Sequence, residues 1–169
     1  NGTIEEIVGY EGIFENVTQI YEAQQELEEQ QRIQQILMEQ SQDGIYVIRE
    51  QNLVLVNDTF CDLVGHKRED LLGKPYLPLI HPEDRSRVVD EVNRKLEGEK
   101  RAPYEFRLAT EGKREHFVRA YSGSLIIDGI PSLYGYLRDV TDELAREQEL
   151  RMRIEQRTAS LNSALQYQK

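Results

Sequence analysis

The chain has 169 residues and a formal net charge of −10. This acidic balance argues against nucleic acid as a partner, because phosphate binding needs clustered Lys and Arg side chains. The sequence has no run of about 18 apolar residues, so it contains no candidate membrane span. Cys61 is the only cysteine. No internal disulfide can form, and a reducing cytoplasm is the expected compartment.

Charge divides the chain into three parts. Residues 1–42 hold nine acidic residues and one basic residue, a net charge of −8. Residues 43–142 hold 18 acidic and 15 basic residues, and residues 143–169 hold four and five, giving net charges of −3 and +1. Acidic and basic residues are both frequent and nearly balanced in the middle part, whereas the N-terminal part is strongly acidic. We therefore expect one globular domain over 43–142, with exposed segments on both sides.

A short pattern occurs twice. The sequence GIFENVT at 12–18 returns as GYLRDVT at 135–141, and a run rich in Glu, Gln and Arg follows each copy. An echo at fixed spacing suggests a repeated structural unit. Because the second copy ends a globular-looking region, we expect residues 1–18 to be the final strand of an earlier domain of the same kind.

The two flanking segments are predicted to be helices. Residues 19–42 and 143–169 lack Gly and Pro and consist largely of strong helix formers. Their apolar residues are few, which fits the narrow seam of a two-helix coiled coil better than a domain core. This pattern predicts a parallel homodimer, and a single solvated helix on each side is the alternative. The expected seam residues are Ile20, Leu27, Leu150, Ile154 and Leu161.

The region between these helices alternates strand and helix signals. Two β-branched runs at 44–50 and 52–57 meet at Gln51, which indicates a tight hairpin. Short helices follow, the first with Asp58 as its N-cap candidate, and a longer helix begins around Pro82. Three further strands are expected at 104–108, 114–127 and 131–140, with a turn at Asp128-Gly129 between the last two. The predicted class is α+β: an antiparallel sheet with a helical insert on one face.

This order of elements resembles the PAS family of sensory domains from about Asp43 to Asp142. The stretches that carry the likeness are HPEDR at 81–85, YEFRLATEGKREHF at 104–117, and DVT at 139–141. The first NVT, at 16–18, is similar to the end of an upstream PAS domain. The resemblance implies a five-stranded antiparallel sheet that encloses a small-molecule pocket together with the helices. The C-terminal segment is similar to linkers that lead into histidine kinase or diguanylate cyclase domains.

Two groups of site residues follow from this reading. Asp139 can cap the helix that begins beside it, so Asp139 and Thr141 are the candidates for coupling the last strand to that helix. The second group consists of apolar and aromatic side chains that are candidates to line the pocket, although plain core packing explains each of them as well. These are Val47, Leu55, Phe60, Leu63, Leu72, Ile80, Val88, Val92, Tyr104, Phe106 and Tyr136.

The sequence gives little support to a metal, a cofactor or catalysis. His66, His81 and His116 are not paired at metal-ligand spacing, and His81 is better explained as a helix-boundary residue. Haem-binding PAS domains use a histidine on the long internal helix, yet residues 83–97 contain none. Flavin photoreceptors of the family need an Asn-Cys-Arg motif, whereas Cys61 lies in TFCDL and fits a core position. No phosphate loop or nucleophile elbow occurs, so no enzyme activity is expected in this segment.

Three functional hypotheses remain. The leading one is a sensory module that dimerises and relays a ligand- or partner-induced change to a downstream effector. The second is a ligand-free spacer that holds two chains in register. The third is a redox or gas sensor with a bound cofactor.

Overall fold

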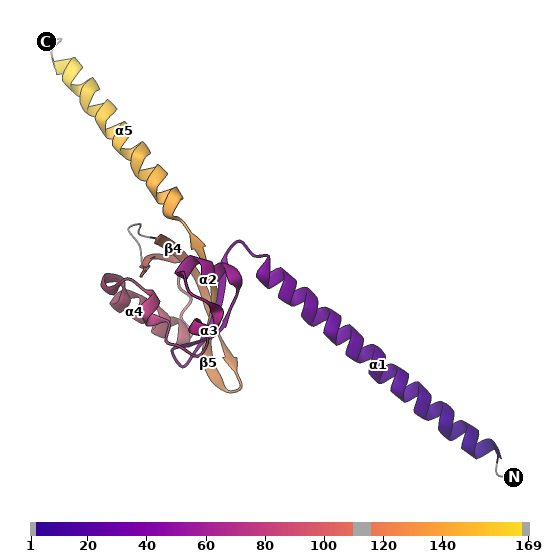
Figure 1. Ribbon diagram of the computed structural model, residues 1–169. Helices are drawn as coiled ribbons and strands as arrows, with labels where there is room; N and C mark the ends of the chain where they lie inside the picture. The colour runs from indigo at the N-terminus through magenta and orange to yellow at the C-terminus, as the bar shows by residue number, and fades with distance from the viewer. Residues whose placement is uncertain (1–2, 110–115, 167–169) are drawn as a thin grey trace. The chain divides into compact units, whose positions relative to one another are not determined.

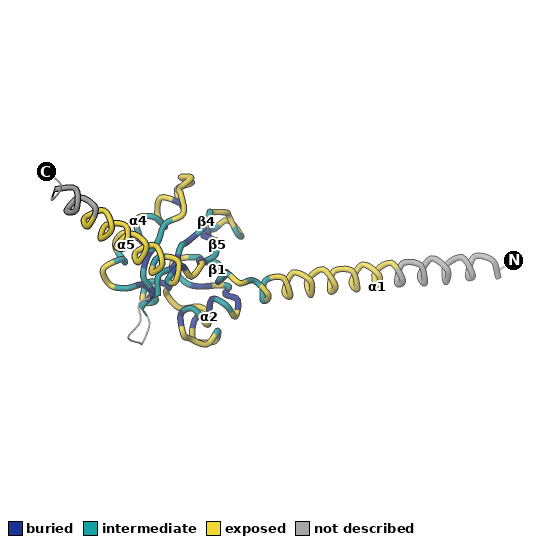
Figure 2. Tube along the Cα trace, turned by 90° about the horizontal axis from the view of Figure 1, so that it is seen from above, coloured by how far each residue is buried: buried dark blue, intermediate teal, exposed yellow. Residues whose placement is uncertain are grey.

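The computed structural model describes the backbone of residues 3–109 and 116–166, and the side chains of residues 19–109 and 116–160. The chain separates into two units, one up to Gln40 and one from Ser41 onward. Figure 2 shows how burial is distributed, with dark blue confined to the second unit and long exposed stretches in both terminal helices.

The N-terminal unit is one helix, α1, Thr3–Glu39. Its side chains are exposed throughout residues 19–37. The helix predicted from residue 19 is confirmed, but residues 3–18, expected as a strand, continue the same helix. A lone strand leaves its backbone N–H and C=O groups without partners, whereas a helix pairs them within the segment. The origin of residues 1–18 in an upstream domain stays a prediction.

The second unit is built on a five-stranded antiparallel sheet in the order β2-β1-β5-β4-β3. Figure 1 shows two of its strands, β4 and β5, together with the helices α2, α3 and α4. The first and last strands, β1 and β5, are therefore neighbours within the sheet. The chain thus enters and leaves the sheet on adjacent strands. The strands are β1 Gly44–Arg49, β2 Asn52–Val56, β3 Tyr104–Leu108, β4 His116–Ile127 and β5 Ile130–Asp139.

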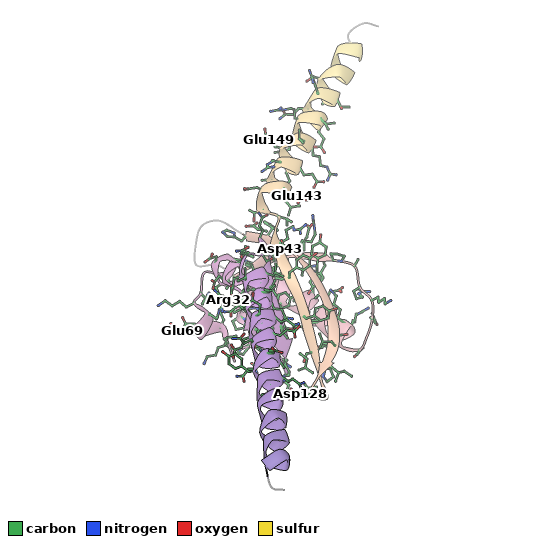
Figure 3. All side chains as sticks on the ribbon, turned by 90° about the vertical axis from the view of Figure 1, so that its right-hand side faces the viewer. Arg32, Asp43, Glu69, Asp128, Glu143 and Glu149 are labelled. Atoms are coloured by element: carbon green, nitrogen blue, oxygen red, sulfur yellow. The ribbon has the colours of Figure 1, made fainter. Side chains whose placement is uncertain are left out.

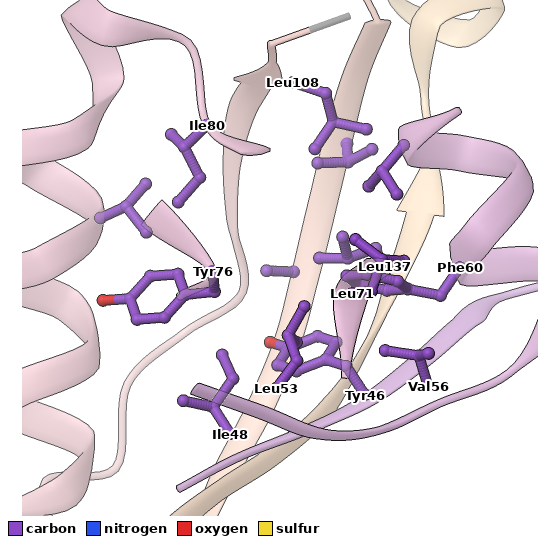
Figure 4. Close-up of a cluster of buried hydrophobic side chains, with 14 of the residues drawn as sticks. Tyr46, Ile48, Leu53, Val56, Phe60, Leu71, Tyr76, Ile80, Leu108 and Leu137 are labelled. Atoms are coloured by element: carbon purple, nitrogen blue, oxygen red, sulfur yellow. The ribbon is translucent and has the colours of Figure 1, made fainter. Parts of the chain in front are cut away.

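Helices inserted between β2 and β3 pack on one face of this sheet, which we call the inner face. Figure 4 shows core side chains, among them Tyr46, Leu53 and Leu137, directed into the space between the sheet and these helices. The predicted α+β class, with a helical insert on one face, is confirmed. The inserted elements are α2 Asp58–Val64, α3 Arg68–Leu71, the 3₁₀ turns η1 Leu77–Leu79 and η2 Pro82–Asp84, and α4 Arg85–Leu96.

Both predicted hairpin turns are present. Glu50 and Gln51 between β1 and β2 have φ of 50° and 68°, and Asp128 and Gly129 between β4 and β5 have φ of 51° and 80°. Two consecutive residues with positive φ define the type I′ turn, whose twist matches that of the strands it joins. Local turn chemistry therefore favours the observed pairing of β1 with β2 and of β4 with β5.

The N-cap of α2 is Asn57, one residue before the predicted Asp58. The buried Asn57 side-chain oxygen accepts hydrogen bonds from the amides of Phe60 at 3.0 Å and Ile45 at 2.8 Å. Its amide group donates to the carbonyl of Asp43 at 3.1 Å. Asn and Asp are both good caps. Asn suits this buried position better because its neutral amide can both accept and donate hydrogen bonds, and no charge has to be buried.

Candidate functional site

A small cavity lies between the inner face of the sheet and the helices. Its volume is about 40 Å³, and its lining is almost wholly apolar. The lining residues are Tyr46, Ile48, Leu53, Phe60, Val64, Tyr76, Leu79, Ile80, Val88, Val92, Tyr104, Phe106, Leu108, Leu133 and Leu137.

The structure brings six of the eleven predicted pocket residues together in this lining. They come from α2, the loop before α4, α4 itself and β3, which are regions where the sequence has a clear period. Their role in ligand binding stays a prediction. The six are Phe60, Ile80, Val88, Val92, Tyr104 and Phe106.

Three predicted strand residues lie outside the cavity lining. Val47 pairs with Leu55 on one side and with Tyr134 on the other, between the inward-facing Tyr46 and Ile48. A β-bulge between Val47 and Ile48 shifts the register, so that Leu53 and Val56 are buried while Leu55 is not. Tyr136 stacks on Tyr121 with ring centroids 4.7 Å apart, and neither ring lines the cavity. A change of one residue in phase moves a strand side chain to the opposite face.

Two predicted helix residues also lie outside the cavity. Leu72 is 39% exposed, and its neighbour Leu71 is buried instead. Leu63 packs against the core cluster beside Gly44 without reaching the cavity, which Val64 lines instead. Adjacent apolar residues at a helix end do not reveal which of the two faces inward, because a short helix has too few turns to establish a period.

Three tyrosines, Tyr46, Tyr76 and Tyr104, belong to the cavity lining. Burial raises the pKa of Tyr46 to about 12, and a hydrogen bond with Ser122 opposes that rise. Burial likewise raises the pKa of Tyr104. Burial raises the pKa of Tyr76 in the same way. The three tyrosines are neutral at physiological pH, and they contribute the hydroxyl groups of an otherwise apolar lining. The sequence analysis missed Tyr46 because it lies in the continuous apolar run IYVI.

A larger surface groove adjoins the cavity. It has a volume of about 650 Å³ and shares Ile48, Tyr76 and Val92 with the cavity lining. Only 9% of Tyr76 and 5% of Val92 is exposed. These three side chains therefore border both the groove and the cavity.

The second candidate site is the strand-to-helix junction, formed by Phe117, Asp139, Val140 and Thr141. Here β5 ends and α5, Thr141–Gln166, begins. The amide of Thr141 donates to the Asp139 carboxylate at 2.8 Å, so Asp139 caps α5 as predicted. The amide of Phe117 donates to the Thr141 hydroxyl at 3.0 Å, and the amide of Val140 donates to the Phe117 carbonyl at 2.9 Å. The start of α5 is thus bonded to β4 as well as being continuous with β5.

Electrostatics reinforce this junction. Burial raises the pKa of Asp139, but the hydrogen bond from Thr141 and the electrostatic influence of the His116 ring, whose Nδ1 lies 3.6 Å away, outweigh that effect and hold the pKa below its ordinary value. Arg119 on β4 contacts Glu143 in the first turn of α5 at 3.0 Å. Figure 3 shows Glu143 near the base of α5 and Glu149 further along it. The first turn of α5 is therefore held by both backbone and charged contacts.

The entry of the chain into the sheet is tied to its exit. Arg138, next to Asp139, donates to the two carboxylate oxygens of Asp43 at 3.0 and 2.8 Å. The Arg138 guanidinium also lies 5.7 and 5.8 Å from the ring centroids of Tyr121 and Tyr136. Such bidentate pairs fix geometry as well as charge. This contact could not be predicted from the sequence, because the two partners are 95 residues apart.

The HPEDR stretch links α4 to β3. The Asp84 carboxylate accepts from the amide and Nε of Arg107 at 2.8 and 3.0 Å, and the amide of His81 donates to the Arg107 carbonyl at 2.9 Å. Hydrogen bonds from Arg107 hold the pKa of Asp84 below its ordinary value. His81 is the N-cap residue of η2, in line with its predicted place at a helix boundary.

Comparison with known proteins shows which fold this is. The family model described as the PAS fold matches residues 53–128. The PAS domain of an HTR-like protein from Haloarcula marismortui is 20% identical, with a TM-score of 0.60, over 70% of this chain and 98% of that one. The compact part of the chain has the PAS fold.

Sensor proteins contribute further structural matches to this PAS domain. A sensory box histidine kinase/response regulator from Burkholderia thailandensis is 22% identical, with a TM-score of 0.57, over 74% of this chain and 97% of that one. A domain of a sensory box sensor histidine kinase/response regulator from Geobacter sulfurreducens is 23% identical, with a TM-score of 0.54, over 67% and 96%. No curated protein matches the chain.

The PAS cavity does not fit haem or a flavin. Its lining holds no His or Cys, and its 40 Å³ is far below the ~300–1,000 Å³ of pockets for drug-sized ligands. Cys61 is 8% exposed and belongs to the core cluster, as predicted. Among the described side chains of residues 19–109 and 116–160, His, Cys, Asp and Glu form no group suited to a metal ion. The absence of a cofactor stays a prediction.

The flanking helices leave most of their predicted seam exposed. Ile20 and Leu27 on α1 are 62% and 54% exposed, and Leu150 and Ile154 on α5 are 58% and 66% exposed. The side chain of Leu161 lies outside the described residues. Neither long helix has, in its described part, an apolar stretch that could span a bilayer.

Proposed function

We propose that the chain is a cytoplasmic sensory module in which the PAS domain binds a small molecule and passes a conformational change along α5. The receiving effector would be of the histidine kinase or diguanylate cyclase class. No catalytic step is assigned to this segment. Two chains act together as a parallel homodimer held by the flanking helices.

The observation that carries this proposal is the continuity between the cavity and α5. Leu133 and Leu137 on β5 line the cavity, and the same strand runs through Asp139 into the first turn of α5. Thr141 is in turn bonded to Phe117 on β4. A shift of β5 caused by a ligand therefore changes the strand-to-helix junction directly, because sheet and helix share backbone and hydrogen bonds there.

The exposed seam residues support the dimer. Four large apolar side chains, Ile20, Leu27, Leu150 and Ile154, are more than half exposed in a single chain. Their spacing of seven residues on α1 and of four on α5 fits the a and d positions of a coiled coil. Burying such a seam against a second copy removes apolar surface from water, which favours association.

Extraction of the purified protein under denaturing conditions, followed by mass spectrometry, tests for a bound small molecule. The relay is tested by hydrogen–deuterium exchange with and without the extracted compound. We expect altered protection in the cavity wall and at the amides of Val140 and Leu144, which are bonded to Phe117 and Val140. A ligand whose effect stops at the cavity wall would contradict the relay.

A ligand-free spacer is the second candidate, and the 40 Å³ cavity volume favours it. A core that is nearly filled by its own side chains needs no ligand for stability. The two candidates differ in one observable. If the chain is a spacer, denaturing extraction releases no small molecule. Hydrogen–deuterium exchange at the strand-to-helix junction then stays the same whichever compound is added.

A further inference from the structure

The strongest unexplained feature of the PAS core is a buried lysine. Lys95 on α4 is 2% exposed, and it continues the buried face formed by Val88 and Val92 at helical spacing. Its ammonium donates to the Ser122 hydroxyl at 2.7 Å and lies 4.8 Å from the ring centroid of Tyr104. A lysine is almost never fully buried unless a carboxylate neutralises it.

No carboxylate forms an ion pair with Lys95 among the described residues. The acidic residue whose charge acts on it most is Glu91, one turn earlier on α4. That carboxylate is held by Arg101, whose guanidinium donates to both of its oxygens at 2.7 and 3.1 Å. Ser122 and the face of Tyr104 are neutral, so the positive charge of Lys95 is left without a counter-ion.

The ammonium stands beside the cavity. Tyr104, over which it lies, is part of the cavity lining. Tyr46, also in the lining, shares Ser122 with Lys95 as a hydrogen-bonding partner. Lys95 and Ser122 are not themselves part of the lining, but they contact Tyr104 and Tyr46, which are. An ammonium and a hydroxyl thus stand directly behind these two tyrosines of a largely apolar wall.

We propose that Lys95 is the anion-binding end of this cavity and that the ligand is a short monocarboxylate with an apolar chain. The inference rests on the proposed function, in that the cavity takes a ligand at all, and adds its chemical class. The carboxylate pairs with Lys95 and accepts from Ser122 or Tyr46, while the chain fills the apolar part. Only the carboxylate oxygens need hydrogen bonds, so no polar group of the ligand is left unpaired.

The size and polarity of the cavity restrict the choice of ligand further. A cavity of about 40 Å³ holds only a few non-hydrogen atoms, since one water needs roughly 10–15 Å³ on the same scale. An alkyl chain of about three carbons fits that space. A phosphate, with polar oxygens on every side, would face an apolar wall and would leave most of them without partners.

The protonation state of Lys95 should depend on whether the anion is bound. Burial lowers the pKa of Lys95, and the Glu91 charge only partly opposes this. A bound carboxylate favours the charged ammonium and therefore raises that pKa again. Binding of the anion should consequently be accompanied by tighter retention of the lysine proton.

The test uses butyrate as the probe and butyramide as its neutral match, each titrated into the whole 169-residue protein and followed by amide NMR shifts at constant ionic strength. We expect butyrate to shift the amides of Val92, Tyr104 and Ser122 in a saturable way. Butyramide should bind at least about 10-fold more weakly, because it lacks the charge that pairs with the ammonium. Lys95→Met should weaken butyrate binding by a similar factor, and the exposed control Lys100→Met should leave it unchanged.

Each outcome decides the matter. Equal binding of butyrate and butyramide, or full butyrate binding by a folded Lys95→Met variant, would overturn the carboxylate inference while the ligand-binding function stands. Absence of binding by both probes would overturn the inference too, and the extraction experiment would then judge the function separately. Should Lys95→Met not fold, the Lys95 side-chain nitrogen resonance in the unaltered protein gives the answer. Its pKa should rise with butyrate, and an unchanged value would refute the proposal.

Discussion

The hydroxyl oxygen of Thr141 lies 3.0 Å from the amide nitrogen of Phe117. The first residue of α5 thus accepts a hydrogen bond from a backbone amide at the start of β4. The carbonyl of the same Phe117 accepts from the amide of Val140 at 2.9 Å. Val140 itself is fully buried. At this step from sheet to helix the chain is buried and forms two hydrogen bonds with Phe117. The angle at which α5 departs therefore depends on β4 as well as on β5.

Thr141→Val tests this step by removing the hydroxyl while keeping the shape of the side chain. The Phe117 amide loses its acceptor, so we expect a loss of roughly 0.5–1.5 kcal/mol in unfolding free energy, measured by urea denaturation. The exposed Thr158, whose hydroxyl bonds only within α5, is the matched control. Thr158→Val should change stability by far less. Equal effects of the two substitutions would mean that the bond to Phe117 contributes nothing specific.

Asp139→Ala addresses the cap of α5. The carboxylate accepts from the amide of Thr141 at 2.8 Å, and loss of an N-cap typically costs about 0.5–2 kcal/mol. If the residue also couples sensing to output, signalling by a histidine kinase fused after α5 should change more than this stability loss explains. Output that simply follows the folded fraction would leave Asp139 with the capping role alone.

Asp84 makes stability depend on pH. Its carboxylate is only 13% exposed and is held by Arg107, which lowers its pKa below the ordinary 3.8. A group whose pKa is lower in the folded state stabilises the fold above its unfolded pKa, and loses that contribution as pH falls through the folded value. Asp84→Asn should therefore cost about 1.5–3 kcal/mol at pH 7. The gap from the unaltered protein should narrow below a pH of about 4.

The matched control for Asp84 is Asp90→Asn, on the exposed side of the same helix α4. Thermal unfolding of both variants and the parent protein between pH 3 and 7 provides the comparison, a range chosen to bracket roughly the ordinary Asp pKa. Asp90→Asn should stay close to the parent throughout. A constant gap for Asp84→Asn over this range would show that its charge is not what Arg107 recognises.

The sequence predicted best where its pattern has one period. YEFRL alternates strictly, and both Tyr104 and Phe106 face the cavity as expected. In IYVI every residue is apolar, so nothing distinguishes the inward Tyr46 from the outward Val47. The bulge breaks the period of β2 instead, where Leu53 and Val56 are both buried although they are three residues apart. A bulge is a property of strand pairing that one strand alone does not encode. The hairpins were predictable because a type I′ turn depends on local residues.

Contacts between distant residues could not be predicted in this way. The pair Arg138–Asp43 and the pair Lys95–Ser122 join positions 95 and 27 residues apart. Lys95 was passed over because lysines on helices usually face solvent. Its spacing from Val88 and Val92, seven and three residues, was nevertheless a usable signal, since it continues the apolar face of α4.

The proposed dimer predicts a concentration-dependent mass. Leu27 and Ile154 are 54% and 66% exposed in the single chain. Light scattering should give twice the chain mass at high micromolar concentration, and the double change Leu27→Asp with Ile154→Asp should give a monomer. Circular dichroism should show the PAS domain still folded, because both side chains are exposed and neither belongs to the core cluster. A monomer in the unaltered protein would refute the coiled-coil seam.

The last prediction concerns the phase of the two helices. Leu27 and Leu150 each lie nine residues after a threonine, Thr18 and Thr141, so both helices are expected to present the same face to the partner chain. A coiled coil transmits rotation only while its seam, which repeats every ~3.5 residues, stays continuous. Inserting seven residues after Arg157 lengthens α5 by ~10 Å and returns the seam residues to the same face of the helix. Inserting two residues instead rotates the rest of α5 by ~200°.

These insertions are best compared in a fusion of the chain to a reporter histidine kinase. The seven-residue insertion should keep most of the regulation seen without an insertion, and the two-residue insertion should lock or invert it. Denaturation of the PAS domain in each fusion serves as the control, since both insertions lie beyond the first turns of α5 and should leave its stability unchanged. If both insertions are tolerated equally, α5 is a passive tether, because a rotation of about half a turn at its end would then carry no information to the effector.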